Sequence, residues 1–347
     1  MATATYKCPN CGGGLRFDPN THRSACEYCL SSFSDAELAA LTQAIDQKAE
    51  KAAERDPDSL HGYICDSCGA EVVTDETTSA TFCYYCHNPV LLTGRLTGDF
   101  RPSRIVPFSY DREKAIATFL AWARKRKFVP KSFYSSSQLE KISGVYLPHW
   151  MIDAEADVDI AGKGIDRRTW TSGDTEYTEH KEYNIVRQGT INVNNIHEVA
   201  MEKIDKQLID AITPYDESQQ KEFSLSYLSG FLAEKYDIPR ETLQPQLESK
   251  AVEYTQLLVQ ESIGSYDQLD LERNRLDLRI KAWNYALLPA WILTYLYRGK
   301  TYVYAVNGQT GKAHGDLPID NKKLNLTGLL VGLGLLALLL LGGAFLW

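Results

Sequence analysis

The chain has 347 residues, of which 44% are hydrophobic and 24% charged, and its formal net charge is −8. Apart from the short segments described below, about 230 residues remain for a folded body, enough for one sizeable core or two small ones. Residues 1–92 carry six Lys and Arg against thirteen Asp and Glu, whereas residues 93–131 carry ten against three. The acidic N-terminal region opposes contacts with phosphate, which argues against nucleic-acid binding there.

The eight cysteines form two tetrads with the same internal spacing. In each tetrad a CxxC pair is followed by fourteen residues and a second CxxC pair, and the second tetrad repeats the first 57 residues later. Two such pairs on a hairpin can hold one ion in a tetrahedral Cys₄ site, which is typical of structural zinc, whereas disulfides are the alternative. The sequence therefore predicts two structural Zn²⁺ ions per chain. The predicted ligands are Cys8, Cys11, Cys26 and Cys29 for the first ion, and Cys65, Cys68, Cys83 and Cys86 for the second.

The tetrads predict two small zinc ribbons of rubredoxin-like β structure in tandem, at residues 1–33 and 59–92. Tyr6 and Tyr63 each precede the first cysteine of a tetrad by two positions, which favours a duplication. Residues 34–58 are predicted as a helical linker, because Ser34 and Glu37 have the spacing of a capping box. The few apolar positions and many charges of this segment indicate a solvated spacer or a weak partner helix.

Residues 98–320 are predicted to form an α+β body. Its first helix lies within residues 107–130, where Ala115, Phe119 and Trp122 recur at helical spacing. The helix ends in the basic cluster at residues 124–127, a favourable place for cations. Contact of this cluster with anionic lipid headgroups or with the acidic ribbons is the alternative interpretation.

Periodicity predicts the other elements of the body. Four carboxylates share one face of a strand or hairpin at residues 145–160, and such a ladder is typical of the solvent-facing side of an edge strand. Binding of a hard cation is the alternative. The carboxylates are Asp153, Glu155, Asp157 and Asp159. Further strands are predicted at 181–193 and 269–280, helices at 197–212, 223–236 and 240–262, and a hairpin at 287–306 that turns near residues 298–300.

The C-terminal residues 324–347 carry no charge and are strongly apolar. Because about 20 apolar residues span a bilayer as a helix, the sequence predicts one C-terminal transmembrane helix. Lys322 and Lys323 directly precede this run, and positive flanks stay on the cytoplasmic side. The predicted location is therefore the cell membrane, as a single-pass protein with its N-terminal domains in the cytoplasm, where reduced thiolates remain available for metal.

The chain lacks the motifs of common enzyme classes. His197 and Glu198 are not followed by the second histidine of a zinc-protease motif. Residues 308–312 are only faintly similar to a phosphate-binding loop, because Pro318 and not a helix follows them. All cysteines belong to the tetrads, so none is left to act as a nucleophile. We therefore expect no enzymatic activity.

Taken together, these features resemble a bacterial family of membrane-anchored zinc-ribbon proteins, the YdjG-like group, often labelled TFIIB-type zinc-ribbon proteins. The paired ribbons carry the resemblance, together with three further segments. These are GVYLPHWMIDAEADVDIAGKG (144–164), SLSYLSGFLAEKYDI (224–238) and LPAWILTYLYRGKTYVYAVNGQTGKAHGDLPID (288–320). The resemblance implies association with PspA-type and SPFH-type envelope-stress proteins at the inner face of the membrane.

The expected function is that of a non-enzymatic, membrane-anchored adaptor. Its two Cys₄ ribbons would recruit cytoplasmic protein partners, because a metal-rigidified hairpin exposes backbone edges and knuckle side chains for docking. Nucleic-acid recognition is one alternative, against which the acidic ribbons argue. A thiol-redox or zinc-responsive sensor is the other, because Cys₄ thiolates can be oxidised with release of metal. The sequence indicates neither the oligomeric state nor the identity of the partner.

Overall fold

The structure is a computed structural model of the whole chain. It describes residues 6–53, 62–65, 71–74, 77–83, 88–92, 96, 98–130, 133 and 139–345. Within these ranges it describes the backbone alone for residues 46–53, 62–64, 71–73, 296, 337–338 and 340–345.

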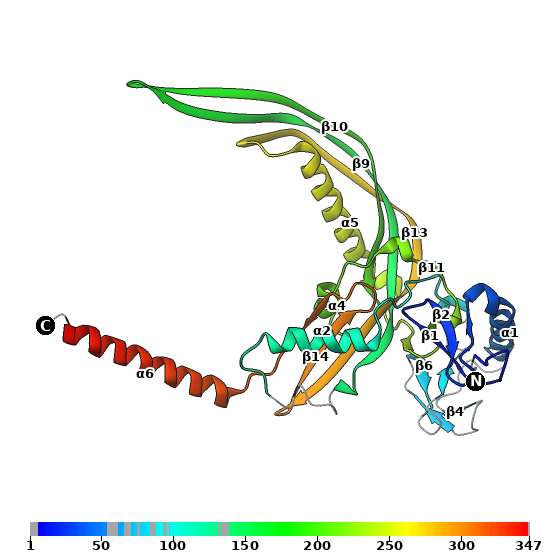
Figure 1. Cartoon of the computed structure of the whole chain (residues 1–347). Coiled ribbons are helices and arrows are strands. Elements are labelled where there is room, and N and C mark those ends of the chain that lie inside the picture. Colours follow the sequence, from blue (N-terminus) through cyan, green and yellow to red (C-terminus); the bar gives the residue numbers. More distant parts are fainter. Residues whose placement is uncertain are drawn as a thin grey trace.

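A ten-stranded sheet forms the body (Figure 1). Its main path runs β11-β8-β13-β9-β12-β6-β7, with β10 beside β9, β14 beside β13 and β15 beside β14. Three strands are much longer than the others and leave the body as a curved arm: β9 (Ser143–Ser172), β10 (Thr175–Val199) and β13 (Gln268–Tyr297). The remaining strands are β6 (Thr78–Phe82), β7 (Pro89–Leu91), β8 (Arg104–Ile105), β11 (Lys221–Glu222), β12 (Leu232–Glu234), β14 (Lys300–Asn307) and β15 (Ala313–Gly315).

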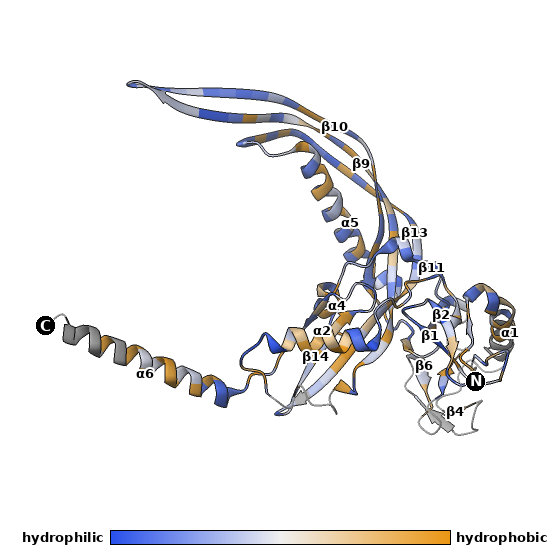
Figure 2. Cartoon of the chain, viewed as in Figure 1, coloured by the Kyte–Doolittle hydropathy of each residue, from blue (hydrophilic) through white to orange (hydrophobic). Residues whose placement is uncertain are grey.

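One helix, α5 (Arg240–Ile263), covers one face of the arm. Its buried side chains recur every four residues, which is the spacing of a single helical face. Val259 and Ile263 at its end pack against Val158 and Ile160 of β9 and Ile185 of β10. Apolar and polar residues alternate along these strands, as Figure 2 shows. The apolar side therefore faces α5 and the polar side faces solvent.

The polar side of the arm carries the four predicted carboxylates. The expectation of an edge strand is wrong, because β9 lies between β10 and β13. Basic side chains of β13 pair with three of the carboxylates across the strands, and Arg104 of β8 lies 3.6 Å from the fourth, Asp153, so the ladder is neutralised by ion pairs. The N–O distances are 3.1 Å for Arg279–Glu155, 2.6 Å for Arg279–Asp157, 3.3 Å for Lys281–Glu155 and 3.4 Å for Arg273–Asp159.

Four of the predicted elements are confirmed within a few residues. Three are the helices α1 (Asp35–Ala53), α2 (Arg112–Arg124) and α5, and the fourth is the hairpin of β13 and β14. The predicted capping box is present at the start of α1, where the Ser34 N–H donates to Glu37 Oε2 over 2.6 Å. The chain turns between β13 and β14 at Arg298 and Gly299, which both have positive φ. The basic cluster 124–127 is exposed at the end of α2. Short 3₁₀ segments lie at η2 (Gly98–Phe100) and η4 (Glu217–Gln219).

Two predicted helices are wrong. Residues 223–236 form a 3₁₀ turn, η5 (Leu225–Leu228), followed by strand β12, and Gly230 turns the chain between them with φ +99°. Residues 197–199 complete β10, so only the short helix α4 (Lys206–Ala211) forms in the predicted segment 197–212. In both cases pairing with distant strands outweighs helical periodicity, and the body is richer in β-sheet than the predicted α+β body.

The first ribbon is a three-stranded sheet of β1 (Leu15–Asp18), β2 (Arg23–Cys26) and β3 (Ser32–Phe33). It lies against the segment 224–230 of the body. The Phe17 N–H donates to the Ser229 carbonyl over 2.8 Å, and the Ser229 hydroxyl donates to the Leu15 carbonyl over 2.5 Å. The rings of Phe17 and Tyr227 meet edge to face at 5.1 Å. The first ribbon therefore packs directly on the body, and the predicted helical linker at residues 34–58 does not separate the two.

The second ribbon divides between two sheets. Strands β4 (Gly62–Ile64) and β5 (Glu71–Val73) form a separate two-stranded sheet. Strands β6 and β7 belong to the ten-stranded sheet, because β6 pairs with β12. The hairpin that carries Cys83 thus continues the body sheet.

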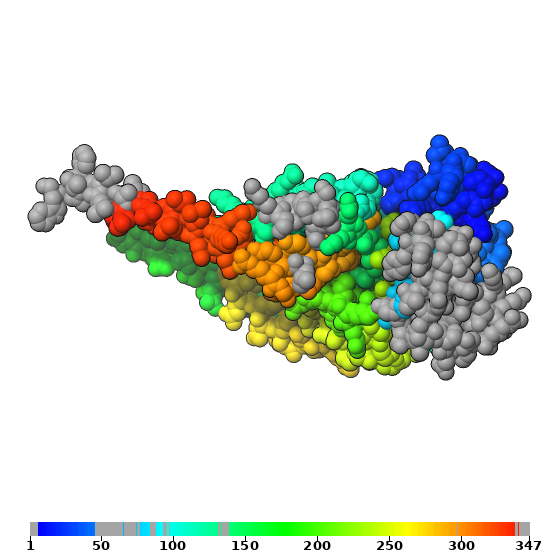
Figure 3. Space-filling model, turned by 90° about the horizontal axis from the view of Figure 1, so that it is seen from below, coloured from blue at the N-terminus to red at the C-terminus, as the bar shows by residue number. Residues whose placement is uncertain are grey.

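The C-terminal helix α6 (Asn321–Phe345) leaves the body on the side away from the first ribbon (Figures 1 and 3). Within the described part of the chain, no helix is both long and apolar enough to cross a membrane. This contradicts the transmembrane helix predicted at residues 324–347. The integral membrane anchor, the single-pass topology and the cell-membrane location, which depended on that helix, are contradicted as well. Residues 346–347 lie outside the described residues.

Candidate metal centre

The four cysteines of the first tetrad converge on one point. Their sulfur atoms all lie within 4.8 Å of one another. The Sγ–Sγ distance is 3.5 Å both for Cys8–Cys29 and for Cys11–Cys26. A tetrahedral zinc site with Zn–S bonds of about 2.3 Å requires S–S separations of about 3.8 Å. Four thiolates at this spacing fit a metal ion of that size, so the tetrad can hold one.

Two identical turns position these sulfurs. In the first turn the Gly12 N–H donates to the Cys8 carbonyl over 2.8 Å, and in the second the Leu30 N–H donates to the Cys26 carbonyl over 3.0 Å. The residue after each CxxC pair has positive φ, +76° at Gly12 and +60° at Leu30. Glycine adopts this conformation without cost, whereas a side chain such as leucine is strained by about 1–2 kcal/mol.

The pKa values of the thiols indicate that a cation would stabilise the cluster. Hydrogen bonds from the side chain and then the backbone of Ser31 lower the pKa of Cys29 to about 6. At Cys11 the backbone of Gly13 lowers the pKa, but hydrogen bonds with Cys26 and Cys29 outweigh it and raise the pKa to about 12. One thiolate therefore forms easily and suppresses the next. A divalent cation relieves this repulsion, because bound thiols are deprotonated.

The centre is closed on one side and open on the other. Cys8 and Cys26 are buried, together with Tyr6 and Leu15, in the core that the ribbon shares with the body. Cys11 and Cys29 are exposed. Two large apolar side chains on the open side are also exposed, Tyr28 at 74% and Leu30 at 86%. The open side therefore presents apolar surface that makes no contribution to the core.

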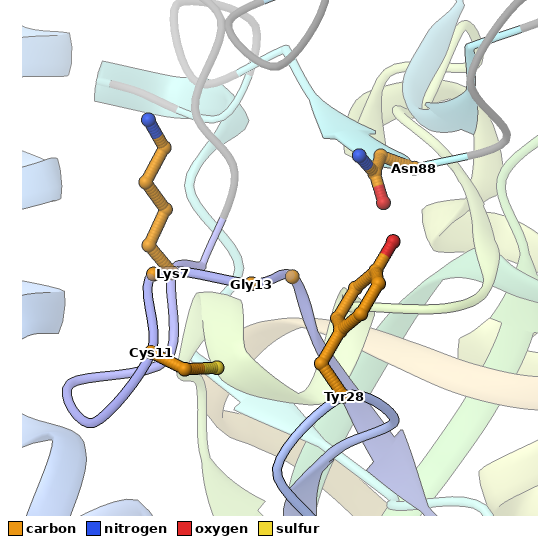
Figure 4. Close-up of a pocket in the computed structure, with 7 residues that line it drawn as sticks. Lys7, Cys11, Gly13, Tyr28 and Asn88 are labelled. Atoms are coloured by element: carbon orange, nitrogen blue, oxygen red, sulfur yellow. The ribbon is translucent and has the colours of Figure 1, made fainter.

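A pocket of about 410 Å³ lies next to this open side, between the two ribbons. Figure 4 shows the Tyr28 hydroxyl and the Asn88 amide pointing toward each other across it, with Lys7 on the opposite wall. The Tyr28 ring covers Gly13, where a Cβ atom would lie 2.5 Å from the ring. The pocket is lined by Lys7, Cys11, Gly12, Gly13, Gly14, Tyr28 and Asn88.

Half of the second tetrad can be placed. Cys65 and Cys83 are buried and pack with Val90 and Leu92. The Cys83 N–H donates to the carbonyl five residues later, at Asn88, over 2.9 Å, as Cys26 does to Ser31. The same bond, from a cysteine N–H to the carbonyl five residues later, is present in both turns of the first tetrad. Cys68 and Cys86 lie outside the described residues, so the second site stays a prediction.

The other candidate groups do not form a site of this kind. The carboxylates of β9 are paired with basic side chains, and among the described residues the potential metal ligands that converge closely are the first four cysteines. The rings of His149 and His197 lie 5.2 Å apart, and burial lowers both pKa values, that of His197 to about 4, but no further potential metal ligand converges on the pair among the described residues. Sequence reasoning missed the apolar side chains around the centre. The sequence did contain a sign of them, because the residue after the first CxxC pair is glycine, whereas the residue after the second pair is Leu30.

Comparison with known proteins identifies one relative of the same length. The chain is 30% identical over 320 residues to a protein of Bacillus subtilis (strain 168) described as "Uncharacterized protein YdjG", and the match covers 92% of each chain. No family model matches the chain, and no solved structure matches it. The relative's description names no partner or activity, so the expected association with PspA-type and SPFH-type proteins receives no support from it.

Proposed function

We propose that this chain, which belongs to the YdjG family, is a non-enzymatic adaptor that binds a protein partner through a metal-stabilised ribbon. The first Cys₄ centre holds a structural zinc ion in this proposal, because four thiolates and no open coordination position are typical of such sites. The second tetrad holds another. The zinc ions fix the ribbons, and the partner docks on the open side of the first centre.

The observation that carries the proposal is the position of Leu30. This leucine is 86% exposed and has φ +60°. It therefore contributes no buried surface and strains the backbone, at a turn where Gly12 occupies the matching place without strain. A residue that weakens the fold and packs against nothing in its own chain is explained by contact with another molecule. Tyr28, which is also exposed and borders the pocket, enlarges the same surface.

The charge of the ribbons favours a protein over a nucleic acid. Residues 1–92 carry thirteen acidic against six basic residues, and each Cys₄ zinc centre would add two negative charges. Binding to DNA or RNA depends on basic side chains that displace counterions from phosphate. The surface proposed here consists instead of an aromatic and an aliphatic side chain, which are typical of the centre of a protein interface.

Leu30→Gly tests the proposal directly. We expect the variant to keep its zinc and to gain about 1 kcal/mol in stability, because glycine relieves the strained turn. We also expect it to lose the partner. Quantitative affinity purification with the full-length protein should show the same proteins depleted in Leu30→Gly and in chelator-treated wild type. Thr21→Gly serves as the control, because Thr21 is also exposed and lies in the turn between β1 and β2. Equal recovery of those proteins by wild type and Leu30→Gly would refute the docking surface.

Metal analysis tests the zinc assignment. Protein purified without added metal should contain about two equivalents of zinc per chain, one for each Cys₄ tetrad. Inductively coupled plasma mass spectrometry on the full-length chain provides the measurement. An excess of iron, or metal-free protein with oxidised cysteines, would count against the assignment.

A further inference from the structure

The outer edge of β10 is open along the arm. Strand β10 pairs with β9 from Thr175 to Val199, and it pairs with no other strand in the described part of the chain. The pairing is regular from Thr175 to Val193, and no proline interrupts it. A long regular edge presents a row of backbone N–H and C=O groups that can pair with an added strand.

Helix α5 supplies an apolar shelf beside this edge. Tyr254, Leu257 and Leu258 are exposed although they belong to a helix that packs closely on the arm, with Leu257 exposed at 51%. The buried stripe of the helix passes through Thr255 and Val259, so these three side chains lie outside it. They border a pocket of about 750 Å³ together with residues 192–197 of β10. The regular strand edge therefore ends at this pocket, beside the helix, and the edge, the helix and the pocket together form one groove.

The floor of the groove is rigidly built. The register of β10 shifts between Val193 and Ile196, where Asn195 takes φ +58°. Its N–H donates to Asp153 over 2.9 Å, its Nδ2 donates to Glu217 over 2.7 Å, and its Oδ1 accepts from Arg104 over 3.1 Å. Each polar group of the Asn195 side chain has a partner, so the bulge holds its shape. A bulge of this kind interrupts the regular pairing and changes the direction of the strand.

The residues that line the groove carry a net negative charge. Asp210, Glu217 and Glu253 line it, and Lys250 is the basic side chain among its lining residues. Lys250 already pairs with Glu198 at 2.6 Å and with Asp210 at 3.0 Å. The carboxylates therefore exceed the positive charge that faces them, which favours an occupant with basic side chains.

We propose that this groove binds an extended, basic segment of a partner protein, which adds to β10 as a further strand and places an apolar side chain on the α5 shelf. A strand edge beside a helix is the arrangement used in β-augmentation, where the backbone supplies affinity and the alternating side chains supply specificity. Because the groove lies on the arm and involves neither tetrad, this site is distinct from the ribbon surface and goes beyond the proposed function.

Fluorescence anisotropy with synthetic peptides tests the groove. The probe is a fluorescein-labelled peptide of alternating lysine and valine with a central leucine, and the full-length protein is titrated into it. Two comparison peptides carry glutamate in place of lysine, or a central proline that removes a ladder hydrogen bond. We expect the lysine peptide to bind at least about tenfold more tightly than either comparison peptide.

Leu257→Lys should weaken binding of the lysine peptide about tenfold, because it removes apolar contact and adds a like charge. Leu269→Lys on β13 is the matched control, because Leu269 is 42% exposed and lies on the other side of α5. Leu258→Lys is a second variant, in case thermal unfolding shows that Leu257→Lys perturbs the helix. Unchanged affinity in both shelf variants, or equal binding of the lysine and glutamate peptides, would refute the groove. Leu30→Gly should bind the peptide as wild type does, so the two proposals can fail separately.

Discussion

Cys26→Ser should remove the metal from the first ribbon and unfold it. Cys26 is one of the two buried cysteines of the first tetrad, and its sulfur lies 3.5 Å from that of Cys11. Metal binding supplies about 10 kcal/mol or more to small zinc domains at neutral pH. A three-stranded ribbon buries too little apolar surface to replace that contribution. Serine is nearly the same size as cysteine but does not provide a thiolate, so the loss is chemical and not steric.

Zinc content and limited proteolysis check this expectation. The variant should contain one equivalent of zinc fewer than wild type, and trypsin should cut rapidly at Arg16 and Arg23, which lie on β1 and β2. Ser31→Ala is the matched control, because it removes the contact between the Ser31 hydroxyl and Cys29 but leaves all four sulfurs in place. A Cys26→Ser chain that keeps full zinc content and resists trypsin would contradict the Cys₄ assignment.

Lys250→Met should destabilise the body. The Glu198 carboxylate that Lys250 contacts at 2.6 Å is only 4% exposed. Removing one partner of a buried ion pair leaves an uncompensated charge and costs about 3–5 kcal/mol. We expect about 3 kcal/mol, the lower end of that range, because Lys206 lies 3.9 Å from Glu198 and offsets part of the charge.

Urea unfolding at neutral pH measures this loss, with Lys206→Met as the matched control, for which we expect less than about 1 kcal/mol. The pH dependence has a defined sign. Burial lowers the pKa of Lys250, but the hydrogen bond and charge of Glu198 outweigh burial and raise the pKa above its ordinary 10.5. A raised pKa means that the stabilisation is complete below pH 10.5 and is lost as the pH rises further. The stabilities of wild type and Lys250→Met should therefore converge in strongly alkaline solution, and a constant difference would contradict the ion-pair explanation.

The cysteine spacing predicted the candidate site more completely than periodicity predicted the body. A CxxC pair dictates a local turn, so the convergence of Cys8, Cys11, Cys26 and Cys29 follows from sequence alone. Local patterns also identified α1, α2 and α5. The predicted helix at residues 223–236 was wrong because Leu232–Glu234 is held by distant strands, and the pattern of a short segment does not record such pairing.

The long arm and the packing of the first ribbon on the body were not predicted, for a related reason. Strands β9 and β10 continue far beyond the predicted segments through residues 165–183, where most side chains on both faces are exposed and the alternation of buried and exposed residues disappears. The apolar C-terminal run predicted a membrane helix by composition, and the described part of the chain contains no helix of that kind. The contact between Leu15 and Ser229 joins residues that no local rule connects.

That contact determines the order in which the chain can assemble during synthesis. The Ser229 hydroxyl and the Leu15 carbonyl are 214 residues apart in the sequence. All four cysteines of the first tetrad leave the ribosome long before Ser229 does, and at 5–20 residues per second the delay is about 10–40 s. Throughout this interval the surface that later covers Leu15 and Phe17 does not yet exist. In the proposed zinc-bound state, the metal ion alone would keep the newly made ribbon folded until residues 224–230, on which the ribbon packs, have been translated.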